Sequence, residues 1–202
     1  IIEADEVTTD YVKKRTDRPY KIYQSDENAK YIFKKTYNAS AMEPIVAKPH
    51  SPDNKAKVSE CEDVKLDRAY IGSCTGGKLT DFMAAAKLLK GKKVQIDTFI
   101  VPATREVEED LHKEKIGSES LIDIFKNAGA HLGEPSCAAC LGGPKDTFGR
   151  AGDNQVVIST TNRNFPGRMG SKQSHVYLAS PYTAAASALT GHITNPAEFV
   201  NN

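Results

Sequence analysis

The stretch AYIGSCTGGKLTDFMAAAKLLKG, residues 69–91, contains the change of pattern on which the fold prediction rests. Residues 69–73 are typical of a short buried strand. From Leu79 onward the apolar residues recur at the three- and four-residue spacing of one helix face, and Gly91 is placed to end that helix. A strand that leads directly into an amphipathic helix is the building unit of parallel sheets, so this stretch predicts an α/β fold.

The same alternation continues toward the C-terminus. The sequence predicts further strands at 94–101, 155–160 and 175–179, and further helices at 118–128 and 181–190. The last helix has Ser180 as its N-cap, Pro181 at its first position and Gly191 beyond its end, which is the expected asymmetry of helix termini. The pattern predicts a mostly parallel sheet covered by helices, a three-layer αβα domain over residues 65–202.

Residues 1–64 differ in texture from the rest of the chain. They are charged and interrupted by prolines, and only the helical pattern around Val7 and Tyr11 is regular. The chain also starts at Ile1 without a methionine. We expect residues 1–64 to be the tail of a preceding α/β domain followed by a proline-rich linker, and the chain to be a fragment.

Composition limits the kinds of partner. The 27 lysines and arginines balance 26 acidic residues and the chain lacks tryptophan, so no basic or base-stacking surface predicts nucleic-acid binding. No apolar run approaches the roughly 20 residues of a spanning helix, which argues against a membrane. Four cysteines in 202 residues are too few for a disulfide framework and favour a reducing compartment. The expected partner is a small molecule or a protein.

Three cysteines lie in glycine-rich segments: Cys74 in GSCTGG, residues 72–77, and the pair Cys137 and Cys140 in SCAACLGG, residues 136–143. Glycines let the backbone approach a bulky group and offer amide donors to it. A structural metal site normally uses four protein ligands, whereas a reactive site leaves one position open for water or substrate. Three thiols on connections next to predicted strands therefore indicate a metal or cluster site in an enzyme.

A C-x-x-C pair also occurs in two other kinds of site. Such pairs form redox dithiols as well as half of a zinc site, and Cys61, His131 or His175 is available in the sequence as a fourth zinc ligand. A non-catalytic zinc-binding module and a thiol redox protein are therefore alternatives to an enzyme. Cys61 itself lies in an acidic stretch and is expected to be a structural residue.

The segment TTNRNFPGRMG, residues 160–170, directly follows a predicted strand. Arg163 and Arg168 are five residues apart in this loop, and their planar guanidinium groups suit bidentate recognition of carboxylates. Two such arginines usually belong to a solvated loop, but Asn162 and Asn164 beside them favour a binding loop. The five histidines of the chain form no metal-binding or catalytic motif.

The sequence resembles the aconitase superfamily, and most closely its isopropylmalate dehydratase branch, in four segments: residues 70–78, 137–144, 161–170 and 177–191. The resemblance extends over nearly the whole chain, and Pro166 and Met169 favour this branch over aconitase itself. It implies an aconitase-like domain with a four-iron four-sulfur cluster, open to substrate at its fourth iron and held by Cys74, Cys137 and Cys140. It also implies that Asn162 hydrogen-bonds the cluster region, while the substrate carboxylates are held by Arg163 and Arg168.

The resemblance further implies a hydro-lyase of leucine biosynthesis that interconverts 2-isopropylmalate and 3-isopropylmalate by dehydration and rehydration. A homoaconitase- or aconitase-type hydratase acting on a related hydroxy di-acid is the alternative within the superfamily. In this family a small subunit with a swivelling domain donates the base, for which the present sequence has no candidate. The resemblance covers only the C-terminal part of the family's large subunit, so we also expect the enzyme to need the N-terminal region, which carries acid and histidine residues of the site. We therefore expect a heterodimer or larger assembly, an inactive isolated chain, and a bacterial or archaeal cytoplasm or a plastid stroma as the compartment.

Overall fold

The structure is a computed structural model and describes residues 2–200 of the chain. The chain divides into two compact units, with the boundary between Met42 and Glu43. The first unit contains α1 (Glu6–Lys13) and a short 3-10 helix, η1 (Ala39–Ala41), and none of its described residues is buried. Asp5 caps α1 by accepting a hydrogen bond from the Thr8 amide at 2.8 Å, as expected for an N-cap aspartate.

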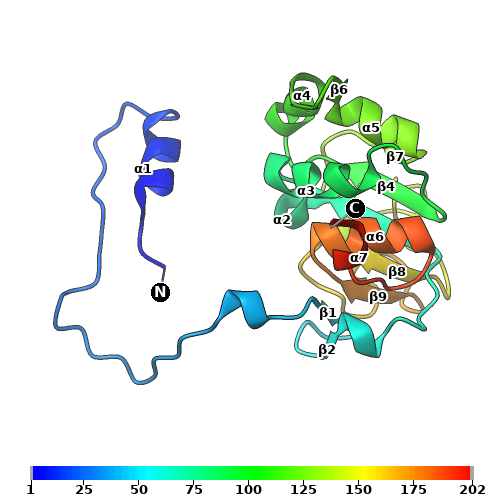
Figure 1. Cartoon of the computed structure of the whole chain (residues 1–202), viewed down its shortest axis with the longest axis horizontal. Coiled ribbons are helices and arrows are strands. Elements are labelled where there is room, and N and C mark those ends of the chain that lie inside the picture. The colour runs from blue at the N-terminus through cyan, green and yellow to red at the C-terminus, as the bar shows by residue number, and fades with distance from the viewer. Residues whose placement is uncertain (1, 201–202) are drawn as a thin grey trace. The chain divides into compact units, whose positions relative to one another are not determined.

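The second unit is built on a seven-stranded sheet with the order β2-β1-β9-β8-β3-β4-β7 (Figure 1). Its strands are β1 (Ile45–Ala47), β2 (Lys55–Lys57), β3 (Arg68–Gly72), β4 (Asp97–Val101), β7 (His131–Leu132), β8 (Val156–Ser159) and β9 (His175–Leu178). The five strands from β9 to β7 run parallel, whereas β1 pairs antiparallel with both β2 and β9. The sheet is therefore mostly parallel, as the sequence predicted, with an antiparallel edge.

Helices cover one face of this sheet. They are α3 (Leu79–Leu89), α4 (Arg105–Lys113), α5 (Leu121–Ala128) and α6 (Pro181–Thr190), with α7 (Ala197–Val200) in contact with α3. Figure 1 shows α3 and α6 next to each other in front of the central strands, and the two helices are in contact. Their alanine-rich faces allow this close approach, and Phe82 and Phe125 meet edge to face at 5.9 Å in the same core.

Loops cover the opposite face of the sheet. A second hydrophobic cluster there joins Tyr70 of β3 and Val157 of β8 to Ala139, Ala151 and Met169, which belong to connecting segments. The only helix among the described residues of these segments is η3 (Ala139–Leu141), a single 3-10 turn. The three predicted helices are all observed, and they lie on one face of the sheet. The opposite face has no helical layer among the described residues, because residues 133–155 and 160–174 are too rich in glycine and proline for long helices.

Several predicted elements are observed with small shifts. Helix α6 has the predicted bounds, with Ser180 accepting from the Thr183 amide at 3.1 Å and Gly191 in the left-handed conformation. The predicted helix 118–128 begins only at Leu121, because Ser120 is its N-cap and ends the β5–β6 hairpin (Lys115–Ile116 and Glu119–Ser120). No helix among the described residues is both long enough and apolar enough to cross a membrane.

The sheet extends further toward the N-terminus than residue 65, where the sequence placed the start of the cluster-bearing domain. Val46 of β1, Ala56 of β2 and Val58 of the 3-10 helix η2 (Val58–Glu60) are buried in the helix-side core. Cys61 lies in the same core and is 3% exposed, in agreement with a structural role. That residues 1–64 also include the tail of a preceding α/β domain stays a prediction.

Candidate functional site

The direction of the strand order reverses between β3 and β8, at whose carboxyl ends the candidate site residues lie. These two strands are neighbours, yet β3 leads through α3 to β4 on one side, while β8 leads to β9 on the other. In open α/β sheets such a point of reversal leaves a crevice between the two departing connections. Cys74 follows β3 directly, and residues 160–170 with their two arginines follow β8 directly.

Cys74 lies in a tight turn, the four-residue helix α2 (Ser73–Gly76). Ser73 is left-handed with φ of 63°, an uncommon conformation for a residue other than glycine. The buried Ser73 hydroxyl hydrogen-bonds the Tyr70 hydroxyl at 2.8 Å, which fixes the base of the turn. The Cys74 side chain itself is exposed.

Thr160 fastens this turn to the end of β8. Its hydroxyl accepts a hydrogen bond from the Gly72 amide at 2.9 Å and donates one to the Gly76 carbonyl at 3.0 Å. Its own amide donates to the Tyr70 carbonyl at 3.0 Å and so extends the β3–β8 pairing by one residue. One buried threonine therefore holds the backbone on both sides of Cys74.

Two glycines are required here because the strand ends approach so closely. A Cβ atom on Gly72 would collide with the backbone of Val101 at the end of β4, and one on Gly76 would collide with Thr160. Backbone and buried threonine cannot move aside as a flexible surface side chain would, so alanine at either position would displace the turn.

The C-x-x-C pair approaches the same end of the sheet from β7. The Ser136 amide donates to the carbonyl of Pro102, which directly follows β4, at 3.3 Å. Cys140 is buried in η3 and Cys137 is half-buried just before it. Gly142 ends the turn with φ of 69°, and a Cβ atom there would lie 2.6 Å from the carbonyl oxygen of Gly167. The cysteine loop and the arginine loop are therefore packed against each other.

The three cysteines and Arg168 form one electrostatic group. Cys74 acts electrostatically on both Cys137 and Cys140, and the Arg168 guanidinium acts on the same two thiols, so the four side chains lie close together. Burial raises the pKa of both the Cys137 and the Cys140 thiols, while the Arg168 guanidinium acts in the opposite direction on each. A cation beside the thiols favours the thiolate, which is the form that binds metal.

The arginine loop contains three unpaired buried polar atoms. Asn162 Oδ1, Asn164 Oδ1 and Arg168 Nε have no hydrogen-bond partner among the described residues, although buried polar atoms are almost always paired. Arg163 is exposed, and its guanidinium donates to the Asn162 carbonyl at 2.8 Å. The structure therefore brings Arg168 to the cysteines and leaves Arg163 at the surface of the loop.

Asn164 has a different task from its neighbours. Its Nδ2 donates to the carbonyls of Lys48 and Val176 at 2.9 and 3.0 Å, which ties the arginine loop to the segment after β1 and to β9. The sequence suggested Asn164 only as a sign of a binding loop, and the structure gives it the role of anchoring that loop.

Sequence reasoning missed Thr160 and Tyr70 as parts of the site. Tyr70 is fully buried, and burial raises its pKa to about 12, with the nearby cysteines adding to the effect. In the sequence Tyr70 is an ordinary strand residue and Thr160 an ordinary strand terminus. Thr160 could have been identified as part of the site only from the pairing of β3 with β8. This pairing brings Thr160 into contact with Gly72, which is 88 positions away in the sequence.

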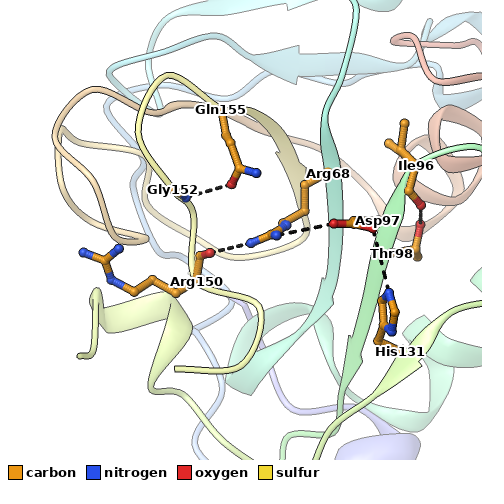
Figure 2. Close-up of polar contacts among 8 residues, drawn as sticks. All are labelled: Arg68, Ile96, Asp97, Thr98, His131, Arg150, Gly152 and Gln155. Carbon is orange, nitrogen blue, oxygen red and sulfur yellow. Dashed lines mark hydrogen bonds and ion pairs between the residues drawn. The ribbon is translucent and has the colours of Figure 1, made fainter. Parts of the chain in front are cut away.

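The residues proposed as a fourth zinc ligand are engaged elsewhere. Cys61 is in the helix-side core, His175 stacks on His50 at 5.2 Å, and His131 faces Asp97 at 3.9 Å (Figure 2). Within residues 2–200, no three or more His, Cys, Asp or Glu side chains are arranged around a single metal ion. A cluster distributes its thiolates over several irons, so three thiols close together, beside an unpaired guanidinium N–H of Arg168, fit a cluster and its anionic ligand.

A comparison with protein families identifies the family of this chain. The model of the aconitase family (aconitate hydratase) matches residues 56–191, which include the three cysteines and the arginine loop. The chain belongs to the aconitase family.

Curated relatives indicate the branch. The chain is 53% identical over 206 residues to the chloroplastic 3-isopropylmalate dehydratase large subunit of Arabidopsis thaliana, covering 99% of this chain and 40% of the relative. It is 45% identical to 3-isopropylmalate dehydratase large subunit 1 of Pyrococcus abyssi and 46% identical to the large subunit of Hydrogenobaculum sp., covering 99% and 100% of this chain. The chain spans 46% of the length of each of these two relatives.

Proposed function

We propose that this chain is part of the large subunit of a 3-isopropylmalate dehydratase, a hydro-lyase that interconverts 2-isopropylmalate and 3-isopropylmalate in leucine biosynthesis. The observation that carries the proposal is the convergence of Cys74, Cys137, Cys140 and Arg168 at the carboxyl end of the sheet. The likeness to proteins named as large subunits of this dehydratase supports the choice of substrate.

Cys74, Cys137 and Cys140 would hold a four-iron four-sulfur cluster. Such a cluster supplies a Lewis acid when one of its irons has no protein ligand. The exposure of Cys74, beside the buried Cys140, supports an arrangement in which one side of the group faces the crevice.

The arginine loop would bind and orient the substrate. Arg168 carries its positive charge beside the thiols and has an unpaired Nε, so it is suited to receive a carboxylate next to the reacting carbons. Arg163, exposed at the loop surface, would hold the second carboxylate once the rest of the protein covers the crevice. Asn162 Oδ1, buried and unpaired, would accept a hydrogen bond in the loaded site. Fixing a dianion at both ends aligns its hydroxyl group and the neighbouring carbon-bound proton for elimination.

The remaining requirements lie outside this chain. No side chain beside Arg168 among the described residues is an evident base for the carbon-bound proton, so we propose that a small subunit with a swivelling domain supplies it. The words "large subunit" in the names of the relatives support such a partner. The isolated chain is then inactive, and exposed thiolates and iron favour a reducing compartment such as a cytoplasm or a plastid stroma.

The proposal is tested by electron paramagnetic resonance of the anaerobically reconstituted and reduced chain, recorded with and without 2-isopropylmalate. We expect the dianion to change the spectrum, and an Arg168→Gln chain to respond only at higher concentrations of substrate. A spectrum that changes with citrate but not with 2-isopropylmalate would favour an aconitase-type hydratase. A colourless chain that binds one zinc tightly through the same cysteines would contradict an enzyme and favour the zinc-binding module.

A further inference from the structure

We propose that Arg150, held in place by Arg68, is the positioning residue that fixes the Cys137–Cys140 loop relative to Cys74. The inference rests on the proposed role of the three thiols as ligands of one group. In physical terms, two partly buried arginines replace the secondary structure that this loop lacks.

Arg150 holds the C-terminal end of the cysteine loop. Its Nε donates to the Gly143 carbonyl at 2.9 Å, and its Nη1 donates to the Ala151 carbonyl at 3.2 Å. The Gly143 amide in turn donates at 2.9 Å to the carbonyl of Ala138, which lies between the two cysteines. The hydrogen bond from Arg150 therefore holds the residue whose amide closes the cysteine turn.

The same segment also holds the end of the arginine loop. The Ala151 amide donates to the Met169 carbonyl at 2.8 Å, and Ala151 forms an isolated parallel bridge with Gly170. A Cβ atom on Gly170 would lie 2.7 Å from Cγ of Arg150, so the glycine makes room for the arginine stem. Arg150 is thus packed between Gly143, at the end of the cysteine loop, and Gly170, two residues after Arg168.

Arg68 connects this segment to β3. Its guanidinium donates to the Arg150 carbonyl, as Figure 2 shows, and lies 4.6 Å from the centre of the Phe99 ring. The Arg68 side chain is 15% exposed. Arg68 is the first residue of β3, and Cys74 follows the last residue of the same strand by two positions. A single rigid strand therefore sets the position of Cys74 directly and that of the other two cysteines through Arg68 and Arg150.

Arginine is the residue that this arrangement requires. A planar guanidinium donates in several fixed directions at once, whereas a lysine ammonium acts as one flexible point charge. Among its described residues the cysteine loop has only the 3-10 turn η3 as regular structure, and most of its other hydrogen bonds are made within the loop itself. The ion pairs of Asp97 with Arg68 and His131, shown in Figure 2, do not hold the cysteine loop. The Asp97 and His131 side chains are 58% and 53% exposed, and such surface ion pairs contribute little to stability.

The test is amide hydrogen exchange of the metal-free 202-residue chain, compared among Arg150→Met, Arg150→Lys and Arg68→Met. Asp97→Asn is the matched control, because it removes a partner of Arg68 without touching Arg150. We expect exchange at Gly143 to accelerate about tenfold or more in Arg150→Met, with a smaller effect in Arg150→Lys and Arg68→Met. Amides of α3 and α6 should exchange as in the parent chain. The second readout is iron bound per chain after anaerobic reconstitution, which should fall in Arg150→Met and stay unchanged in Asp97→Asn.

Unchanged exchange at Gly143 in Arg150→Met, together with unchanged iron content, would overturn the proposal. If Arg150→Met unfolds the whole domain, Arg150→Lys decides by the same comparison of Gly143 with α3. Because exchange is measured without metal, acceleration at Gly143 would support the positioning role even if the parent chain formed no cluster, and only the proposed function would then fail.

Discussion

Replacement of Thr160 by valine removes the clamp on the Cys74 turn with almost no change in shape. The hydroxyl of Thr160 makes two hydrogen bonds to backbone groups, one to the Gly72 amide and one to the Gly76 carbonyl, both in the buried interior. Valine is nearly isosteric but leaves both groups unpaired. Each unpaired buried backbone group costs about 1–3 kcal/mol, so we expect Thr160→Val to lower the free energy of unfolding by about 2–6 kcal/mol.

Thr160→Ser is the matched control. Serine retains both hydrogen bonds and removes one methyl group, which costs about 1 kcal/mol of buried apolar contact. Urea denaturation followed by circular dichroism measures both variants, with the slope of the transition confirming that the same surface is exposed on unfolding.

A local readout separates the clamp from general stability. Because Thr160 holds the backbone on both sides of Cys74, we expect the rate of Cys74 alkylation in the metal-free chain to change in Thr160→Val and to remain close to the parent value in Thr160→Ser. The reasoning is refuted if valine and serine at this position give the same stability and the same Cys74 alkylation rate.

The remaining predictions concern the glycines, the loop anchor, the buried thiol and the buried phenol. Gly76→Ala places a Cβ against Thr160 and should destabilise the chain by about 1–3 kcal/mol in urea denaturation, whereas Gly91→Ala, with open space around it, should cost only the strain of its left-handed backbone, about 1 kcal/mol. Asn164→Leu removes the hydrogen bonds that Asn164 donates to the Lys48 and Val176 carbonyls and that anchor the arginine loop. We therefore expect the loop amides to exchange hydrogen faster than in the parent chain. Iodoacetamide followed by mass spectrometry should label Cys74 well before Cys61, because burial raises the pKa of the Cys61 thiol and shields it; equal labelling of the two would contradict the buried position of Cys61. Burial raises the pKa of Tyr70 to about 12, so the unfolded chain ionises first and stability should fall as the pH rises from about 10 to 12, by up to about 2–3 kcal/mol, a loss that Tyr70→Phe should lack.

The sequence predicted those parts of the fold whose signals are local. Helix α6 has an N-cap serine, a first-turn proline and a terminal glycine within twelve residues, and its bounds were predicted without error. Helix α4 was missed because Leu111 is its only buried residue, so its sequence has no apolar stripe. Strands β1 and β2 were missed because they are three residues long and lie among prolines.

The sequence indicated which side chains the candidate site contains, but not which residues hold those side chains in place. Three cysteines in glycine-rich segments and a loop with two arginines could be read from the chain, and the structure brings the cysteines together with Arg168. Other residues hold the site in place: Thr160, Arg68 and Arg150. Thr160 and Arg68 contact backbone groups 82 or more positions away in the sequence, and Arg150 binds the backbone carbonyl of Gly143. Such contacts depend on strand order, and no local pattern in the sequence specifies it.

Iron and acid-labile sulfide per chain after anaerobic reconstitution test the central claim most directly. They should be measured on the parent chain, on Cys74→Ser, Cys137→Ser and Cys140→Ser, and on Cys61→Ser as the matched control. We predict about four iron and four sulfide per chain for the parent and for Cys61→Ser, and a large loss of both in each of the other three variants. A parent chain that takes up no iron, or one that loses as much iron with Cys61→Ser as with Cys74→Ser, would contradict the account.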